Sequence, residues 1–281
     1  MKQWGLLLLC SMFCSGVAAQ EQSGKLTFIL SGPAEFLVVD PQGRREGIDS
    51  MLNYRTALDE IPGSYYGTGG AGSENPDLPG TVTTECEIGA ASHGTYRVHV
   101  TGTSAGTYRL DIFASNPPAG GTQVSFLGVV TRHRTETLRI DFNAGTAGLL
   151  NVARVMTMTL LRQDIRDLFA AGLLEPERFY RELIQKVRAM ERLLSRRDSD
   201  KVYPLLREFR KDIERVHERS LNQEHPGKRN RNGPVISEDA FRILMKDVDL
   251  LMDQSPRGKK ERGHGEREDG RKKEKRERER D

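Results

Sequence analysis

The sequence is poor in cysteine, in tryptophan and in long apolar runs. Three cysteines among 281 residues cannot build a disulfide-rich scaffold, so the fold must depend on packing. No apolar run after the N-terminal segment is long enough to span a bilayer. A dominant charge is missing too, because 43 Lys and Arg stand against 40 Asp and Glu, a net charge of +3. This balance argues against a wholly basic nucleic-acid binder and against a strongly acidic disordered chain.

The sequence also lacks a recognisable catalytic or metal-binding motif. Gly102–Gly106 fits the G-x-S-x-G pattern, but that motif needs a strand followed by a helix, and here we expect a strand on both sides. Gly67–Gly72 fits G-x-G-x-x-G, but the proline-containing segment after it prevents the helix that would hold a pyrophosphate. We interpret Gly67–Gly72 as a flexible loop. The six histidines show no zinc spacing with one another or with Cys86.

Two alternatives stay open at this point. We expect no cofactor, but calcium is an alternative to that expectation, and turns are the first interpretation of the acids that could supply its oxygen ligands. These are Asp40, Asp49, Asp59, Glu60 and Asp77. A hydrolase site assembled from distant residues is the other alternative, with Ser104, His99 or His133, and Asp111. Against it, His99 lies on the strand that leads into the loop of Ser104 itself, so it is not placed as a separate base.

The first nineteen residues have the pattern of a secretory signal. Lys2 precedes an apolar stretch, Leu6–Phe13, and Val17-Ala18-Ala19 supplies small residues for cleavage near Ala19–Gln20. We therefore expect a secreted or periplasmic protein. A lipoprotein is excluded because no small residue precedes either N-terminal cysteine. Cleavage would leave Cys86 alone, and a lone cysteine is more often a small buried apolar residue than a nucleophile.

Composition divides the rest of the chain into three segments. Residues 20–150 hold 19 of the 28 glycines and have a net charge of −5. Residues 151–256 hold three glycines and have a net charge of +3, and residues 257–281 have a net charge of +4. We expect a β-sandwich domain, a helical bundle domain and a disordered charged tail in this order.

The first of these segments alternates apolar and polar residues in short runs. The expected strands are Leu26–Leu30, Glu35–Asp40, Thr95–Thr101, Thr107–Ala114, Gln123–Thr131 and Thr137–Phe142. We expect Asp40–Gly43 to form a turn and Gly102–Gly106 to join two strands as a hairpin. About seven short strands predict an antiparallel sandwich of the immunoglobulin-like type.

The second segment has the 3.6-residue period of helices. Phe179, Leu183, Val187, Met190 and Leu194 form one apolar stripe. Similar stripes cover 205–216 and 241–251, and an earlier helix ends at Gly172. We expect Pro176 to open the second helix, Ser237 to cap the last, and charged residues to lie on the faces away from the apolar stripes. Four such helices predict a compact bundle.

Basic residues outside these helices offer a possible polyanion-binding site. They lie in the loop before the last helix and in the tail, and they are Lys228, Arg229, Arg231, Lys259, Lys260, Arg271, Lys272 and Lys273. Eight acids dilute the twelve bases of the tail, so we favour a solubilising role for it.

Two family resemblances complete the interpretation. Leu160–Leu174, the helical stripes and Ile236–Phe241 resemble the FIMAH-type helical domain of bacterial extracellular proteins over residues 158–254. Glu35–Gly43, Ile61–Tyr65 and Gly94–Arg97 are similar to small immunoglobulin-like β modules of bacterial secreted proteins. Both resemblances imply non-catalytic accessory domains. The basic loop Lys228–Arg231 is a departure from the first family.

The sequence therefore predicts a secreted, non-catalytic binding or interaction protein. Its expected partner is a protein or a cell-envelope polymer outside the cytoplasm, and no nucleic acid is expected. A hydrolase with an unrecognised site, or a polyanion binder that uses the basic loop and tail, are the alternatives.

Overall fold

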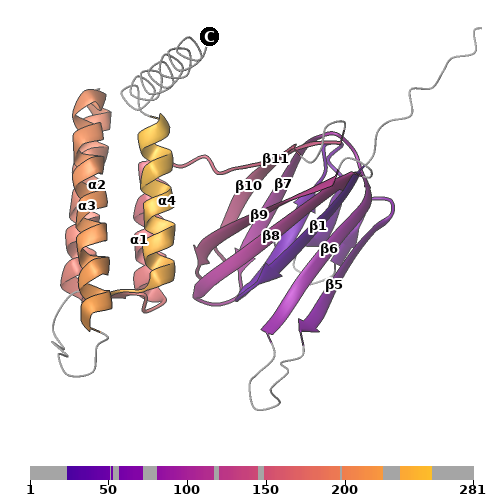
Figure 1. Ribbon diagram of the computed structural model, residues 1–281, viewed down its shortest axis with the longest axis horizontal. Helices are drawn as coiled ribbons and strands as arrows, with labels where there is room; N and C mark the ends of the chain where they lie inside the picture. The colour runs from indigo at the N-terminus through magenta and orange to yellow at the C-terminus, as the bar shows by residue number, and fades with distance from the viewer. Residues whose placement is uncertain are drawn as a thin grey trace, which may run out of the picture.

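The protein consists of a two-sheet β half and a four-helix half, seen side by side in Figure 1. This computed structural model describes residues 24–50, 52, 57–71, 81–116, 120–144, 149–196, 198–223 and 235–254. Within these ranges, no helix is both long enough and apolar enough to cross a membrane. The expected order of strands followed by helices is confirmed.

Eleven strands form the two large antiparallel sheets of the β half. The five-stranded sheet has the order β5 (Ser64–Ala71), β6 (Thr81–Ala91), β1 (Gly24–Ser31), β8 (Gly106–Asn116) and β9 (Gly120–Val130). The six-stranded sheet has the order β11 (Leu149–Ala153), β10 (Thr135–Asn143), β7 (Gly94–Gly102), β2 (Ala34–Val39), β3 (Arg45–Ile48) and β4 (Ala57–Asp59). The immunoglobulin-like label stays a prediction.

The alternating pattern of the strands builds a core between the two sheets. Tyr96 and Val98 of β7 and Tyr108 and Leu110 of β8 are all buried in one cluster with Phe28 of β1. Their neighbours along each strand face outward and are mostly polar, as the two-residue period requires. The buried face of each sheet was therefore predictable from the alternation alone.

The connection between β7 and β8 is not the expected hairpin. β7 pairs with β2 and β10, whereas β8 pairs with β1 and β9 in the other sheet. The segment Gly102–Gly106 therefore crosses from one sheet to the other. The two strands face each other across the core. Two strands that are neighbours in one sheet would show the same alternation of apolar and polar residues, so the sequence pattern does not distinguish the two arrangements.

The glycine-rich segment that we expected to be a loop is a strand as far as it is described. Residues Gly67–Ala71 continue β5 and pair in register with Thr81–Glu85 of β6. Because β5 lies at the edge of its sheet, it needs only this one neighbour, and an edge position tolerates residues that pack weakly. Gly72 lies outside the described residues.

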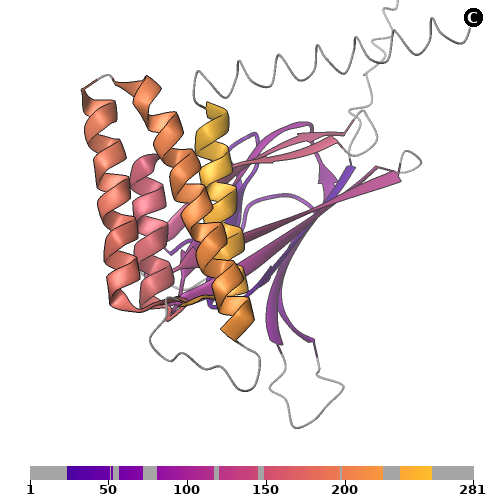
Figure 2. The same cartoon turned by 60° about the vertical axis from the view of Figure 1, so that its left-hand side comes forward.

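The helices are α1 (Met158–Ala170), α2 (Glu177–Ser195), α3 (Ser199–Gln223) and α4 (Glu238–Gln254). Their axes run side by side in Figure 2, and their apolar stripes form a second core. Gly172 ends α1 with a φ of +72°, and Pro176 directly precedes α2. Ser237 caps α4, because its Oγ accepts a hydrogen bond of 3.2 Å from the amide of Ala240. A short pairing of β12 (Leu174–Glu175) with β13 (Val235–Ile236) joins the start of α2 to the start of α4.

Candidate functional site: the junction of the sheets and the helices

A buried arginine joins the two halves of the chain. Arg154 directly follows β11, and its side chain is 4% exposed. Its Nε lies 2.5 Å from Glu136 Oε1 on β10, its Nη2 lies 2.8 Å from Asp164 Oδ2 on α1, and its Nη1 lies 2.8 Å from Asp247 Oδ1 on α4. A single guanidinium therefore binds one carboxylate of the sandwich and two of the helical half. Pairing of this kind offsets the free-energy cost of burying charged groups.

A second arginine repeats the arrangement at the loop before β10. Arg134 forms ion pairs with Asp164, at 2.5 Å between Nη2 and Oδ1, and with Asp167. Thr131 donates a further hydrogen bond of 3.2 Å to Asp167 Oδ1. The β half therefore supplies the buried Arg154 and the half-buried Arg134, and α1 supplies acids that bind them.

The ion-pair cluster consists of Arg134, Arg154, Glu136, Asp164, Asp167 and Asp247. Burial raises the pKa of two of its acids. Burial raises the pKa of Glu136, and Arg154 and the Tyr108 hydroxyl oppose that shift. The Tyr108 hydroxyl donates to Glu136 Oε2 at 2.7 Å, and burial raises the pKa of this phenol. Burial also raises the pKa of Asp247 well above the usual range, and the negative charge of Asp164 adds to the shift. Asp247 therefore keeps its proton to higher pH than an exposed aspartate does.

Sequence reasoning missed these acids, because we expected the charged residues of the helices to face solvent. That expectation is wrong for Asp164, Asp167 and Asp247, which are at most 2% exposed. A signal was present. Asp164 lies between Leu161 and Ile165 on the apolar stripe of α1, and Asp247 holds the equivalent place on the stripe of α4. An acid inside an apolar stripe requires a buried partner.

Apolar contacts accompany the ion pairs at the junction. Val129 of β9 belongs to the same buried cluster as Met156, Met158 and Leu161 at the start of the helical half. α1 and α4 both pack against β9. The junction thus combines buried ion pairs with apolar contacts, which favours one fixed arrangement of the two halves.

A groove of about 510 Å³ opens beside this junction, between β8, β9 and α4. Its floor includes Tyr108, Phe126 and Leu127, and its helical wall carries Asp239, Arg242 and Lys246. Its strand wall carries Ser31, Thr107, Arg109 and Ser125. The volume lies in the range of small-ligand sites, and such sites favour the boundary between two parts of a protein.

Lys246 is the distinctive residue of the groove. Its Nζ lies 3.9 Å from the centre of the Phe126 ring, a cation–π contact. Burial lowers the pKa of this ammonium, and the neighbouring Asp247 opposes the shift. In the described part of the chain, no carboxylate lies within ion-pair distance of Nζ. The ammonium is therefore available to an anion that enters the groove.

The other cations of the groove already have acidic partners. Arg242 Nε lies 2.7 Å from Glu238 Oε1, and Arg109 Nε lies 3.0 Å from Asp111 Oδ1. Asp239 accepts a hydrogen bond of 3.2 Å from Thr107, which connects α4 to β8 across one end of the groove. These pairs leave Lys246 as the cation with the greatest capacity to bind a new anion.

The structure does not bring together Ser104, His99 and Asp111, which were considered for a hydrolase site. His99 faces outward from the six-stranded sheet, where its Nδ1 lies 2.9 Å from Thr137 Oγ1. Asp111 faces outward from the five-stranded sheet and pairs with Arg109 and Ser125. The two side chains lie on opposite outer faces of the sandwich, so they cannot act on Ser104 together. His133 lies near Ser104 in the fold, since its amide donates to Gly102 O at 2.8 Å.

Three of the acids considered for calcium form ion pairs with arginine, whereas Asp59 of β4 lies opposite Glu46 of β3. Asp40 binds Arg44 at 2.6 Å, and it also caps the turn that it begins. Glu60 binds Arg45 at 2.7 Å, and Asp49 binds the same arginine at 3.3 Å. No three potential ligands gather in the described ranges, and Asp77 lies outside them.

Cys86 is fully buried and unpaired in a disulfide. Burial raises the pKa of its thiol, and the nearby Glu46 adds to the shift. It packs as a small apolar residue, as expected. The expected signal, the basic loop residues and the basic tail residues all lie outside the described ranges.

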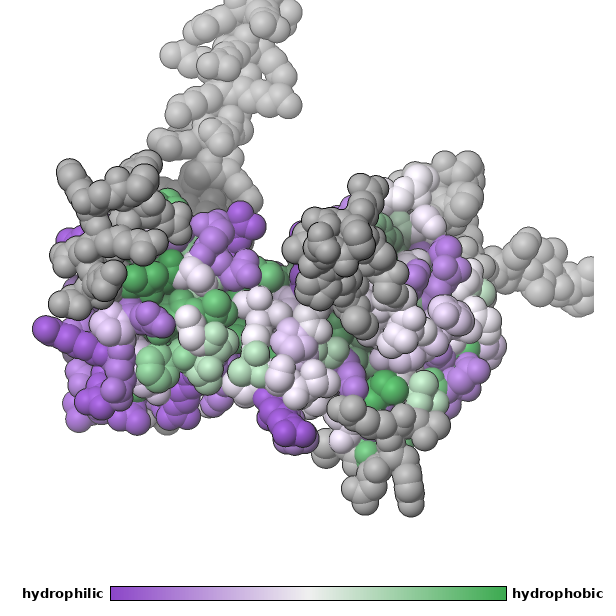
Figure 3. Space-filling view, turned by 90° about the horizontal axis from the view of Figure 1, so that it is seen from below, coloured by the Kyte–Doolittle hydropathy of each residue, from purple (hydrophilic) through white to green (hydrophobic). Residues whose placement is uncertain are grey.

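Exposed large apolar side chains are found on both halves of the described protein. Seen from below, green hydrophobic residues lie among purple hydrophilic ones (Figure 3). Leu221 and Val235, near the lower end of α3, are 50% and 41% exposed. Scattered apolar residues of this kind are normal on a protein surface, so they identify no partner.

Comparison with known proteins gives no family. No family model and no curated protein matches the chain. Among solved structures, a domain of unknown function, DUF4425, from Bacteroides vulgatus ATCC 8482 is similar at 12% sequence identity and a TM-score of 0.17. That similarity covers 48% of this chain and 98% of the other. A score this low assigns neither a fold nor an activity.

Proposed function

We propose that the protein is a non-catalytic binding protein that acts outside the cytoplasm and holds a small anionic ligand in the groove between β8, β9 and α4. The observation that carries this proposal is the position of Lys246. Its ammonium lies over Phe126, has no acidic partner among the described residues, and borders a groove built by both halves of the chain. An anion with an apolar body matches these two features.

The ion-pair cluster supports this function by fixing the walls of the groove. α4 carries both Lys246, which faces the groove, and Asp247, which binds Arg154 at 2.8 Å on the buried side. One helix therefore couples the groove to the cluster. A preorganised site loses less conformational entropy when a ligand binds.

Location outside the cytoplasm is part of the proposal and is supported by the signal pattern of residues 1–19. The N-terminal sequence of the protein recovered from the producing cells tests it. We expect the mature chain to begin at Gln20. Recovery of the uncleaved chain from the cytoplasm would contradict this part of the proposal.

Binding is tested by isothermal titration of the purified protein with octanoate, phenylacetate and glucuronate, with octanol as the uncharged probe. We expect at least one carboxylate to bind more tightly than octanol. Lys246→Met, which removes the charge but keeps the length, should weaken that binding about tenfold, the value of one charge-assisted hydrogen bond. The matched control is Lys201→Met, because Lys201 is 68% exposed on α3 and lies outside the groove.

Turnover is tested in parallel on panels of peptides, esters and glycosides. We expect none. Robust hydrolysis by the purified protein would overturn the proposal. A Lys246→Met variant that binds every tested carboxylate as tightly as the native protein does would also overturn it.

A further inference from the structure

Two arginines face each other directly on the outside of the six-stranded sheet. Arg97 of β7 and Arg139 of β10 are paired in register, and both side chains are exposed. Their neighbours along the strands, including Val98 and Leu138, are buried in the core. Directly opposite residues in a sheet have Cβ atoms about 5 Å apart, so the two guanidinium groups share one place on the surface.

The neighbours of this pair neutralise it only in part. On the other side of Arg97 the register places Val39, and on the other side of Arg139 it places Ala153. Arg139 Nε lies 3.0 Å from Asp141 Oδ1, whereas Arg97 has no carboxylate within ion-pair distance among the described residues. Like charges placed opposite each other destabilise a sheet. The five-stranded sheet shows the ordinary arrangement, in which Lys25 binds Glu87 at 2.8 Å.

A hollow of about 420 Å³ lies beside the two arginines. Arg134 and Arg154 also line it, but their charges are matched by the buried acids of the junction. Arg97 remains able to bind an anion, and so does Arg139 through its Nη groups, because only its Nε contacts Asp141. A planar guanidinium binds a carboxylate through two parallel hydrogen bonds, and two guanidiniums side by side can bind one or two such groups.

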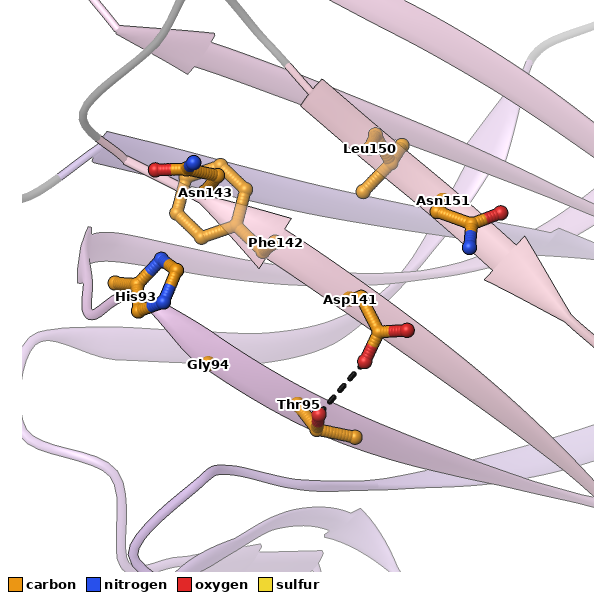
Figure 4. Close-up of a pocket in the computed structure, with 8 residues that line it drawn as sticks. All are labelled: His93, Gly94, Thr95, Asp141, Phe142, Asn143, Leu150 and Asn151. Atoms are coloured by element: carbon orange, nitrogen blue, oxygen red, sulfur yellow. Dashed lines mark hydrogen bonds between the residues drawn. The ribbon is translucent and has the colours of Figure 1, made fainter.

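A second hollow of about 340 Å³ continues the same face (Figure 4). It begins one step along the strands, where Thr95 of β7 is paired with Asp141 of β10, and Asp141 in turn is paired with Asn151 of β11. Thr95 donates a hydrogen bond of 2.6 Å to Asp141, and His93 and Asn143 lie at the far end. Leu150 supplies apolar surface, and Phe142, which is 2% exposed, borders the hollow from the core.

We propose that the outer face of β7, β10 and β11 binds an acidic polysaccharide. The carboxylates of its uronic acid units would bind Arg97 and Arg139, and an adjoining sugar would occupy the second hollow. Sugar rings present hydroxyl groups and apolar C–H faces together. The second hollow offers the Asp141 carboxylate and the Asn151 amide to the hydroxyl groups, beside the apolar side chain of Leu150. An acidic peptide would use the arginines equally well but has no need of the second hollow. This surface is separate from the groove of Lys246.

The test is the retention of the full-length protein and its variants on immobilised polygalacturonate, with dextran and polyglutamate as comparison polymers. We expect retention on polygalacturonate that weakens with salt and exceeds retention on both other polymers. The double variant Arg97→Gln with Arg139→Gln should bind at least about tenfold more weakly. Its melting temperature should not fall, because it removes a repulsive pair.

The matched control is Arg178→Gln with Arg181→Gln, which removes two exposed arginines from α2 and should leave retention unchanged. Asn151→Leu tests the second hollow and should weaken polygalacturonate binding without changing polyglutamate binding. Equal retention on polyglutamate and polygalacturonate, or retention that the Arg97 and Arg139 double variant does not change, would overturn the proposal. Lys246→Met serves to separate the two proposals, because only the groove should respond to it.

Discussion

Arg154 and Asp164 form a buried ion pair, 2.8 Å between Nη2 and Oδ2, that joins the end of the last large-sheet strand to the first helix. Asp164 also binds Arg134 through its other oxygen. One carboxylate of α1 is therefore held by two arginines of the β half. This arrangement makes the junction a part of the folded core and relates the stability of the β half to that of the helices.

Removing Arg154 should destabilise the whole protein. Arg154→Met leaves Glu136 and Asp164 buried without their shared cation, and breaking a buried ion pair from one side costs about 3–5 kcal/mol. Urea unfolding followed by circular dichroism measures the free energy of unfolding. Arg178→Met is the control, because Arg178 is 89% exposed and should contribute below about 1 kcal/mol. Equal stability of the two variants would show that the cluster is not what holds the junction.

Asp247 should make the protein less stable as pH rises. Burial raises its pKa in the folded protein, whereas an unfolded aspartate has a pKa of about 3.9. Above about pH 4, the unfolded chain has lost a proton that the folded chain keeps, so the free energy of unfolding falls as pH rises toward the folded pKa. The contribution is complete at lower pH. Glu136, whose pKa burial also raises, acts in the same direction.

Asp247→Asn should reduce this dependence, because asparagine has no proton to lose. We expect the difference in unfolding free energy between pH 5 and pH 8 to be smaller in the variant than in the native protein. Asp249→Asn is the matched control, since Asp249 lies on the same helix, is 54% exposed and pairs with Arg210. An identical pH dependence in Asp247→Asn and the native protein would show that Asp247 is ionised in the folded state.

Cys86 should resist alkylation in the folded protein. It is fully buried on β6, and burial raises the pKa of its thiol, so little thiolate exists at pH 8. Iodoacetamide labelling followed by peptide mass spectrometry should find Cys86 unmodified in buffer and modified in concentrated urea. Rapid labelling under native conditions would require a local opening of the five-stranded sheet.

The sequence could predict which residues are buried in the sheets but not which strands are neighbours. Tyr96 and Tyr108 each begin an alternating apolar run, and both are 1% exposed, as their patterns indicate. Their strands nevertheless belong to different sheets, because a sandwich core is lined from two sides. Alternation reports the direction of a side chain relative to its own strand, and pairing depends on partners that are distant in sequence.

The helical half was more predictable because its pattern and its end signals agree. Gly172 and Ser237 mark helix ends in the sequence and in the structure. The junction was not predictable in the same way. Glu136 and Arg154 look like ordinary surface residues of a strand and a linker. Contacts that are distant in sequence bury them, with Tyr108 for Glu136 and with α1 and α4 for Arg154. The groove of Lys246 depends on such contacts as well.

Gly128 should be essential to the geometry of the cluster, because it leaves room for Tyr108. A Cβ atom at position 128 would lie 2.5 Å from Cε1 of the Tyr108 ring, and β9 and β8 place the two residues directly opposite each other. Gly128→Ala must therefore displace the ring, and the Tyr108 hydroxyl would move away from Glu136, which it now meets at 2.7 Å. Overpacking of this kind costs about 1–3 kcal/mol, and the lost hydrogen bond to a buried carboxylate adds to it.

The measurement is urea unfolding of Gly128→Ala beside Gly69→Ala. Gly69 lies on the edge strand β5, and a Cβ there would meet only Thr83 Oγ1 at 3.8 Å, an ordinary contact. We expect Gly69→Ala to change stability by less than about 0.5 kcal/mol, as surface substitutions do. The double variant Gly128→Ala with Tyr108→Phe should be destabilised by less than the sum of the two single variants, because both disturb the same hydrogen bond. Full additivity would place the effect of Gly128 in the packing of the sheet rather than in the contact between Tyr108 and Glu136.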